Sequence, residues 1–223
     1  MTRPSHPDTV ADTRLAELAD EVRAIAEDAG RVIMKIYAAG FAVTEKTDAT
    51  PVTDADHAAE DLILPRLRAL TPDVPVISEE EASRGEDPSR DGVTFWAVDP
   101  LDGTREFIAR SGEFSVNIGL IRDGVPVFGV VHGPDLGLTF YTDGIGGVRR
   151  AATGAPGTPI ASRAVPPEGL TVIGSRSHAV SRKIAAFLED KTVAAYRPMG
   201  SALKFGFLAE GSAASAGPEY PRN

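Results

Sequence analysis

The 223-residue sequence contains no cysteine and only four histidines. The absence of cysteine excludes disulfides, thiolate zinc sites and cysteine nucleophiles. The histidines are scattered along the chain, without the close pairing of a helix-borne zinc motif. A histidine-rich transition-metal site is therefore not expected.

The sequence also lacks a long apolar run and an excess of positive charge. No apolar segment approaches the about 20 residues that cross a bilayer, and the N-terminus has no hydrophobic block typical of a secretory signal. The 23 lysines and arginines face 32 aspartates and glutamates, and the resulting net charge of −9 disfavours nucleic-acid binding. We expect a cytoplasmic protein without nucleic-acid or membrane partners.

The remaining composition, with 42% hydrophobic and 25% charged residues, is that of an ordinary globular protein. Apolar residues recur every three or four positions over 12–39, which predicts a long amphipathic helix. A second helix is predicted to begin with Thr53 or Asp54 as its N-cap and to run to Leu70.

Short strand-like segments, separated by acidic or glycine-bearing turns, follow the two helices. They cover residues 74–77, 94–98, 115–121, 125–131 and 138–141. We expect them to form a meandering sheet that packs on the helices.

The stretch 151–167 is rich in Ala, Gly, Thr and Pro and predicts a boundary. It divides the chain into an N-terminal α+β part (1–155) and a C-terminal α/β part (156–223). In the second part we predict a strand at 171–174 and helices at 180–188 and 201–209.

The strongest chemical signal is Trp96-Ala-Val-Asp99-Pro-Leu-Asp102-Gly103-Thr104, in which an apolar strand leads two carboxylates into a turn. Gly103 lets the backbone approach a ligand closely. Mg²⁺ prefers oxygen ligands and usually takes one or two carboxylates, which leaves positions for water and substrate phosphate. For an isolated Asp-x-x-Asp-Gly, a plain turn with a capping aspartate is an equal alternative.

Two further acidic clusters, 53–56 and 78–81, lie at the ends of predicted elements, so three clusters can meet at one metal site. The Asp-Gly-Thr segment is also similar to the Asp-x-Asp-Gly-Thr signature of phosphatases whose first aspartate is the nucleophile. That position is Pro100 here, so a metal-activated water is the better attacking group.

Three motifs, Pro51-Val-Thr-Asp-Ala-Asp56, Ile77-Ser-Glu-Glu80 and the Trp96–Thr104 segment, together resemble the inositol monophosphatase superfamily of Mg²⁺-dependent, lithium-sensitive phosphomonoesterases. Thr104-Arg-Glu-Phe-Ile108 and Gly200-Ser-Ala-Leu-Lys204 look like its 3′(2′),5′-bisphosphate nucleotidase branch. The resemblance implies a sandwich of alternating helix and sheet layers. It also implies hydrolysis of the 3′-phosphate of adenosine 3′,5′-bisphosphate to leave AMP. An inositol or sugar monophosphatase is the alternative within the family.

The resemblance also implies roles for single residues. The implied ligands for two or three Mg²⁺ ions are Glu79, Asp99, the carbonyl of Leu101, and Asp102. Asp56 and Thr104 would orient or deprotonate the attacking water. Asp54 is expected as a helix cap, and Glu80 and Glu81 as solvated loop charges.

The candidate contacts to a small phosphorylated substrate are Gly103, Thr104, Arg176, His178, Ser201 and Lys204. Arg176 can form a bidentate phosphate contact, and Lys204 supplies a point charge. Two alternatives remain open: His178 can cap the helix that follows it, and Lys204 can extend to solvent.

Beyond Gly211 the sequence has no counterpart of the family's Trp-Asp-x-Ala-Ala-Gly motif, whose aspartate binds the second metal. We therefore expect an incomplete C-terminal half and a second Mg²⁺ that is weakly held or completed by a partner chain. A homodimer would cover the open sheet edge. A catalytically impaired protein that binds metal or phosphate is the alternative from a different class.

Overall fold

The computed structural model describes residues 12–45, 51–83, 94–175 and 182–212. Its helices are α1 (Asp12–Ala39), α2 (Asp54–Leu70), α3 (Glu79–Ser83), α4 (Thr104–Ile108), α5 (Arg182–Leu188) and α6 (Leu203–Ala209). Its strands are β1 (Val43–Glu45), β2 (Pro51–Thr53), β3 (Val76–Ser78), β4 (Thr94–Asp102), β5 (Ser115–Arg122), β6 (Val125–Gly133), β7 (Leu138–Thr142), β8 (Val148–Ala152), β9 (Thr158–Ile160), β10 (Leu170–Ser175) and β11 (Val193–Met199).

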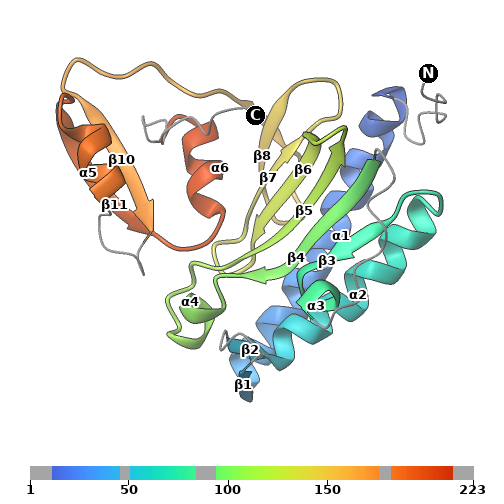
Figure 1. Cartoon of the computed structure of the whole chain (residues 1–223). Helices are drawn as coiled ribbons and strands as arrows, with labels where there is room; N and C mark the ends of the chain where they lie inside the picture. Colours follow the sequence, from blue (N-terminus) through green and yellow to red (C-terminus); the bar gives the residue numbers. More distant parts are fainter. Residues whose placement is uncertain (1–11, 46–50, 84–93, 176–181, 213–223) are drawn as a thin grey trace, which may run out of the picture.

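Helices and sheets alternate in layers (Figure 1). α1 and α2 lie on one face of a seven-stranded sheet, and α6 separates the other face from a parallel two-stranded sheet of β10 and β11. Leu188 of α5 packs on Leu170 and Val172 of β10. This arrangement confirms the layered sandwich expected from the sequence.

α1 is a helix of 28 residues, with the predicted bounds, that buries one apolar stripe. The stripe consists of Leu15, Leu18, Val22, Ile25, Ala29 and Ile33. At Gly40 the backbone turns to φ 95°, and its amide donates to the Ile36 carbonyl over 3.0 Å. Glycine adopts this left-handed conformation without the steric cost of a Cβ, so the helix ends where the sequence predicts.

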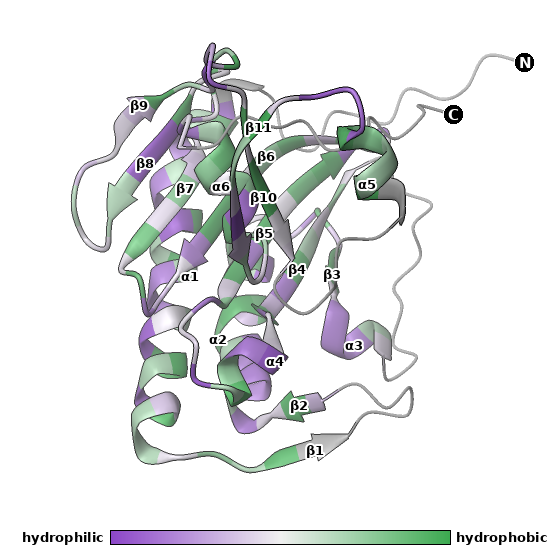
Figure 2. Ribbon diagram, turned by 90° about the vertical axis from the view of Figure 1, so that its left-hand side faces the viewer, coloured by the Kyte–Doolittle hydropathy of each residue, from purple (hydrophilic) through white to green (hydrophobic). Residues whose placement is uncertain are grey.

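The large sheet has the order β3-β4-β5-β6-β7-β8-β9, with β3 parallel to β4 and the remaining neighbours antiparallel. The prediction missed β8 and β9. β8 includes a hydrophilic stretch (Figure 2) at Arg149 and Arg150, which hides the apolar alternation of a strand. β9 lies inside the stretch predicted as a boundary, so the sheet continues to Ile160, and the division at 155/156 stays a prediction.

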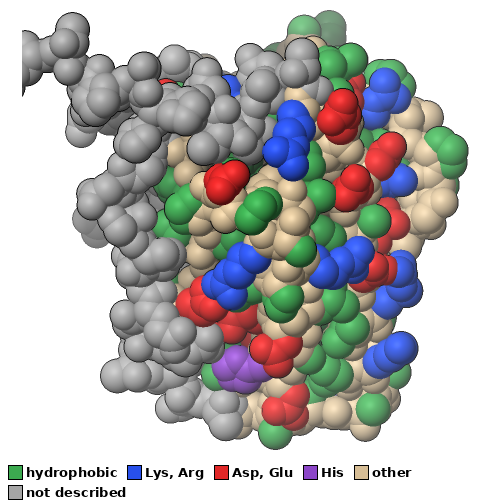
Figure 3. Space-filling view, turned by 90° about the vertical axis from the view of Figure 1, so that its right-hand side faces the viewer, with side chains coloured by type: hydrophobic (Ala, Val, Ile, Leu, Met, Phe, Trp, Pro, Cys, Tyr) green, Lys and Arg blue, Asp and Glu red, His purple; other side chains and the backbone are tan. Residues whose placement is uncertain are grey.

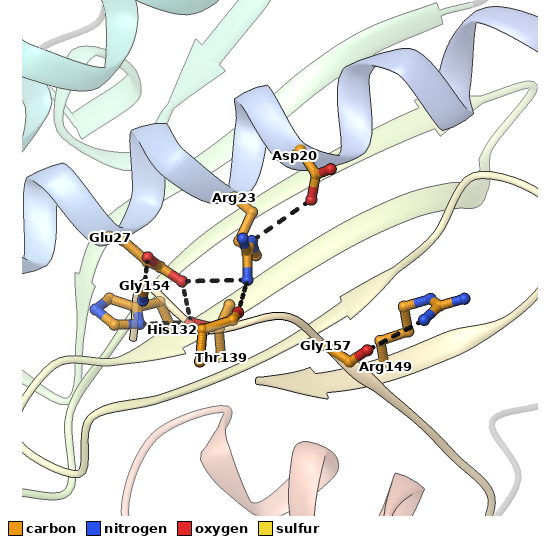
Figure 4. A network of polar contacts seen from close by, with 9 residues as sticks. Asp20, Arg23, Glu27, His132, Thr139, Arg149, Gly154 and Gly157 are labelled. Atoms are coloured by element: carbon orange, nitrogen blue, oxygen red, sulfur yellow. Dashed lines mark hydrogen bonds and ion pairs between the residues drawn. The ribbon is translucent and has the colours of Figure 1, made fainter. Parts of the chain in front are cut away.

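A buried polar network ties α1 to the sheet (Figure 4). The Glu27 carboxylate accepts hydrogen bonds from the Thr139 hydroxyl (3.1 Å) and the Gly154 amide (3.0 Å). Thr139 Oγ1 lies 2.9 Å from Nδ1 of the buried His132. A Cβ at Gly30 would lie 2.5 Å from the His132 ring, so only glycine lets the helix approach this closely. Burial lowers the pKa of His132 to about 4, so its ring is neutral at pH 7.

Acidic and basic side chains are interspersed on the face shown in Figure 3. Ion pairs between neighbouring helices include Arg66 with Asp28 and Arg68 with Glu81. Exposed pairs of this kind contribute little to stability, so the apolar core does most to hold the layers together. Among the described residues, no helix has both the length and the apolar composition needed to cross a membrane.

Candidate active site

A β-bulge in β4 brings two aspartates to the same side of the large sheet. Asp99 pairs with Asn117 of β5 and Asp102 with Ser115, so three steps along β4 oppose two along β5. Residues three apart in a regular strand point to opposite faces, and the extra residue of a bulge reverses this alternation. Both aspartates therefore line one cleft.

The cleft has a volume of about 340 Å³ and lies between the two halves of the chain. Its lining residues are Pro51, Glu79, Asp99, Leu101, Asp102, Gly103, Thr104, Arg105, Glu106, Ser175, Ser201 and Lys204. Eight of the eleven residues predicted from the sequence for the site thus line the cleft, and Asp56 contacts one of them. The other two, Arg176 and His178, lie outside the described residues. Asp56 does not line the cleft, but its carboxylate contacts the hydroxyl of Thr104, which does.

The carboxylates of Glu79, Asp99 and Asp102 crowd one wall of the cleft. Burial, followed by the negative charges of Glu79 and Asp102 and a hydrogen bond with Glu79, raises the pKa of Asp99 to about 8. A carboxyl that resists ionisation in this way lacks a compensating positive charge. A hard divalent cation supplies such a charge and prefers carboxylate oxygens, so this donor set fits Mg²⁺.

Hydrogen bonds from two separate segments of the chain hold the Asp102 carboxylate in place. Asp102 Oδ2 accepts hydrogen bonds from Asn117 Nδ2 (3.3 Å) and the Ala202 amide (2.5 Å). Asn117 Oδ1 and Ser115 Oγ are buried nearby without a hydrogen-bond partner. Within the described part of the chain, no three acidic or histidine side chains are arranged so that they hold a metal ion by themselves.

Asp56 is fixed by the start of α2. Thr53 is the N-cap, and its amide (2.8 Å) and hydroxyl (2.6 Å) both donate to Asp56 Oδ2 in a capping box. The Thr104 hydroxyl contacts the other oxygen, Oδ1, at 3.4 Å and the Leu101 carbonyl at 3.2 Å. Of the two predicted N-caps, Thr53 is confirmed. The expectation for Asp54 was wrong, because it instead accepts the Ala42 amide over 3.2 Å.

The acidic run that begins at Glu79 forms the single-turn helix α3 instead of a loop. Glu80 is buried, and Glu81 pairs with Arg68, so the expectation that both are solvated loop charges was wrong. Oε1 of the buried Glu60 on α2 accepts the Glu81 amide over 3.2 Å. α2 therefore positions both Asp56 and the turn that carries Glu79.

Gly103 joins β4 to the single turn of α4. Its φ is 89°, and a Cβ there would lie 3.1 Å from the Glu113 carbonyl and 3.3 Å from the Ser201 Cβ. Glycine is thus required both by the backbone angle and by the close approach of the neighbouring chain. This packing sets Asp102 and Thr104 on either side of the glycine at the floor of the cleft.

The C-terminal half contributes a turn before α6. Ser201 is a buried residue with φ 51°, and its carbonyl accepts a hydrogen bond from the Lys204 ammonium. Ser175, at the end of β10, lines the same cleft.

Several lining residues were not predicted as site residues. Pro51 is the first residue of a predicted motif, Ser175 precedes the candidate Arg176, and Arg105 and Glu106 follow Thr104. Their places in the sequence could therefore have indicated them. Asn117 does not line the cleft but donates to Asp102; it lies in an apolar strand, and only the pairing of β4 with β5 reveals it.

The chain with this layered fold and acidic cleft also matches the model of a known protein family. The model of the inositol monophosphatase family matches residues 14–219, and the chain belongs to this family of phosphatases. Enzymes of this family are generally metal-dependent. The resemblance inferred from the sequence is confirmed.

Among its relatives, the 3′(2′),5′-bisphosphate nucleotidase CysQ of Escherichia coli (strain K12) is 40% identical over 205 residues, which cover 91% of this chain and 79% of the relative. The nucleotidase CysQ of Buchnera aphidicola is 38% identical over 92% of this chain and 75% of its own. The crystal structure of CysQ from Bacteroides thetaiotaomicron, a bacterial member of the family, superposes with a TM-score of 0.66 at 30% identity. The superposition covers 87% of this chain and 76% of that one.

Proposed function

We propose that this protein is a Mg²⁺-dependent 3′(2′),5′-bisphosphate nucleotidase that hydrolyses the 3′-phosphate of adenosine 3′,5′-bisphosphate to give AMP and phosphate. The observation that carries this proposal is the 40% identity to CysQ nucleotidases over 91% of the chain. The branch-specific segments also support it, since Thr104–Glu106, Ser201 and Lys204 all line the acidic cleft.

A cation is needed because the cleft is acidic while the substrate is an anion. Among the described residues, its lining contains the four acids Glu79, Asp99, Asp102 and Glu106 and the two bases Arg105 and Lys204. Glu79, Asp99, Asp102 and the Leu101 carbonyl would hold two or three Mg²⁺ ions. Bound Mg²⁺ supplies positive charge to the phosphate oxygens and to the leaving 3′-oxygen.

Thr104 and Asp56 would orient the attacking water. With its proton directed to Asp56 Oδ1, the Thr104 hydroxyl presents a lone pair to the cleft and can accept a hydrogen bond from water. Asp56 can then take up the proton that moves through the hydroxyl. One water oxygen forms a bond to phosphorus as the bond between phosphorus and O3′ breaks. The leaving O3′ takes up a proton from solvent water, and Asp56 later releases its proton to solvent.

The remaining substrate contacts come from the C-terminal half. The Ser201 hydroxyl and the Lys204 ammonium would contact the nucleotide from the cleft lining. Arg176 and His178, which lie outside the described residues, stay candidates from the sequence. Lys204 supplies a compact positive charge, which suits a phosphate group.

A substrate comparison tests this function. Phosphate release would be measured from adenosine 3′,5′-bisphosphate, AMP, inositol 1-phosphate and fructose 1,6-bisphosphate at saturating Mg²⁺. We expect kcat/KM for the bisphosphate nucleotide to exceed that for each other substrate by at least about tenfold. Preference for the inositol or sugar phosphate would establish the alternative activity, and no release from any substrate by folded protein would exclude an active phosphatase.

A further inference from the structure

The turn Gly200–Ala202 is anchored to the N-terminal half of the molecule by two carboxylates. The Gly200 amide donates to Glu113 Oε2 over 2.8 Å, and the Ala202 amide donates to Asp102 Oδ2 over 2.5 Å. These contacts join residues 87 and 100 positions apart in the sequence. Glu113 does not itself line the cleft, whereas the turn that it holds carries Ser201, which does.

Glu106 and Glu113 pack so closely against the start of the turn that only glycine fits at position 200. A Cβ at Gly200 would lie 2.6 Å from the Glu106 Cγ and 2.7 Å from the Glu113 carbonyl oxygen. Glu113 therefore contacts this turn with its backbone as well as with its side chain. Such close approach places the Gly200 amide within reach of the Glu113 carboxylate.

Ser201 adopts a backbone conformation that its side chain disfavours. Its φ of 51° lies in the left-handed region, although serine has a Cβ. A residue keeps such a conformation only where the surrounding structure enforces it. Here the flanking amides of Gly200 and Ala202 are both held by carboxylates, and Lys204 donates to the Ser201 carbonyl.

We propose that Glu113 is a positioning residue for substrate binding. Its carboxylate fixes the Gly200 amide and so holds Ser201 in its left-handed conformation. This conformation keeps the Ser201 hydroxyl and the Lys204 ammonium at the cleft wall. The part of the inference that concerns substrate rests on the proposed function, because the turn acts on the reaction only by binding the nucleotide.

Steady-state kinetics with adenosine 3′,5′-bisphosphate test this role. Glu113→Ala is expected to raise KM about tenfold while kcat stays within about threefold, because ground-state and transition-state binding are lost alike. Glu113→Gln keeps an oxygen acceptor at the same reach and is expected to restore KM to within about twofold of the wild type. Glu168→Ala changes an exposed glutamate outside the cleft and serves as the matched control.

Glu113→Asp keeps the charge but withdraws the acceptor by one methylene group, so it should raise KM as Glu113→Ala does. If Glu113→Ala does not fold, Glu113→Asp tests the positioning role in its place. An unchanged KM in Glu113→Asp, or a failure of Glu113→Gln to restore KM, would overturn the proposal.

Hydrogen exchange separates this inference from the proposed function. Deuterium uptake at the Gly200 amide, followed in a peptide that spans the turn, should rise in Glu113→Ala and Glu113→Asp and remain at the wild-type level in Glu113→Gln. Unchanged uptake in both of the first two variants would overturn the anchoring role, whatever substrate the enzyme prefers. A wild-type protein that releases no phosphate from the nucleotide contradicts the proposed function, and the exchange result alone then decides the inference.

Discussion

The Thr104 hydroxyl lies 3.4 Å from Asp56 Oδ1, although the two residues are 48 positions apart in the sequence. The second oxygen of the same carboxylate accepts two hydrogen bonds from Thr53 at the start of α2. Asp56 thus closes a helix N-terminus with one oxygen and faces the cleft residue Thr104 with the other. A single carboxylate couples the stability of α2 to the geometry proposed for the attacking water.

Thr104→Val tests whether the Thr104 hydroxyl orients the attacking water and passes its proton to Asp56. Valine keeps the shape of threonine but removes the hydroxyl, so we expect kcat to fall about 100-fold, within the range typical of general acid and base catalysis, with little change in KM. Initial rates of phosphate release give both constants.

Thr104→Ser provides the matched control because it keeps the hydroxyl. It should retain most of the wild-type kcat. A valine variant with near-normal kcat would remove Thr104 from the catalytic machinery.

Asp99→Asn should stabilise the protein in the absence of metal. The amide has nearly the same shape as the carboxylate but removes one of the mutually repelling charges of Glu79, Asp99 and Asp102. At this chain length, about 1 kcal/mol of relief raises Tm by about 2–4 °C. Calorimetry in EDTA at pH 8 measures the shift.

The exposed Asp73→Asn serves as the control for the loss of one negative charge elsewhere, and its Tm should change little. We also expect Mg²⁺ to raise Tm of the wild type more than that of Asp99→Asn. A variant that is less stable than the wild type in EDTA would show that the three carboxylates do not strain the metal-free cleft.

His132 should make stability depend on pH between about 4 and 6.5. Burial lowers its pKa to about 4, so in this window the unfolded chain binds a proton that the folded protein does not. Stability is therefore complete above the unfolded pKa and is lost as pH falls toward the folded one. From this histidine alone, we expect the free energy of unfolding to be about 2 kcal/mol lower at pH 5 than at pH 7.5.

Urea unfolding of His132→Gln at both pH values isolates this contribution, because the variant has no imidazole to titrate. Its stability should decline less on acidification than that of the wild type. The exposed His57→Gln is the matched control and should behave as the wild type does. An equal decline in all three proteins would assign the pH dependence to other groups.

Periodicity in the sequence was enough to place the long elements. α1 has a regular apolar stripe and clear end signals, and its bounds match the prediction. β8 and β9 were missed because these two short strands have little apolar alternation. Whether an acidic run such as Glu79–Ser83 forms a helix depends on tertiary contacts, here those of Glu60, that no local pattern records.

The candidate site could likewise be predicted only where local motifs define it. The motifs named Glu79, Asp99 and Asp102 of the cleft, but not the bulge that turns Asp102 to the same side as Asp99, since a bulge depends on pairing with β5. The motifs did not indicate Glu113 or Asn117 either, for a related reason. Each acts through a contact to a distant part of the chain, to Gly200 and Asp102 respectively.

The most direct test of the account is a Mg²⁺ titration of phosphate release from adenosine 3′,5′-bisphosphate by the wild type and by Asp99→Asn. We predict no release in EDTA, saturable activation of the wild type by Mg²⁺, and a loss of at least about 100-fold in the folded variant, as expected when transition-state charge stabilisation is removed. Wild-type release that does not depend on added divalent cation, or an Asp99→Asn variant with wild-type activity, would contradict a metal-dependent site at this cleft.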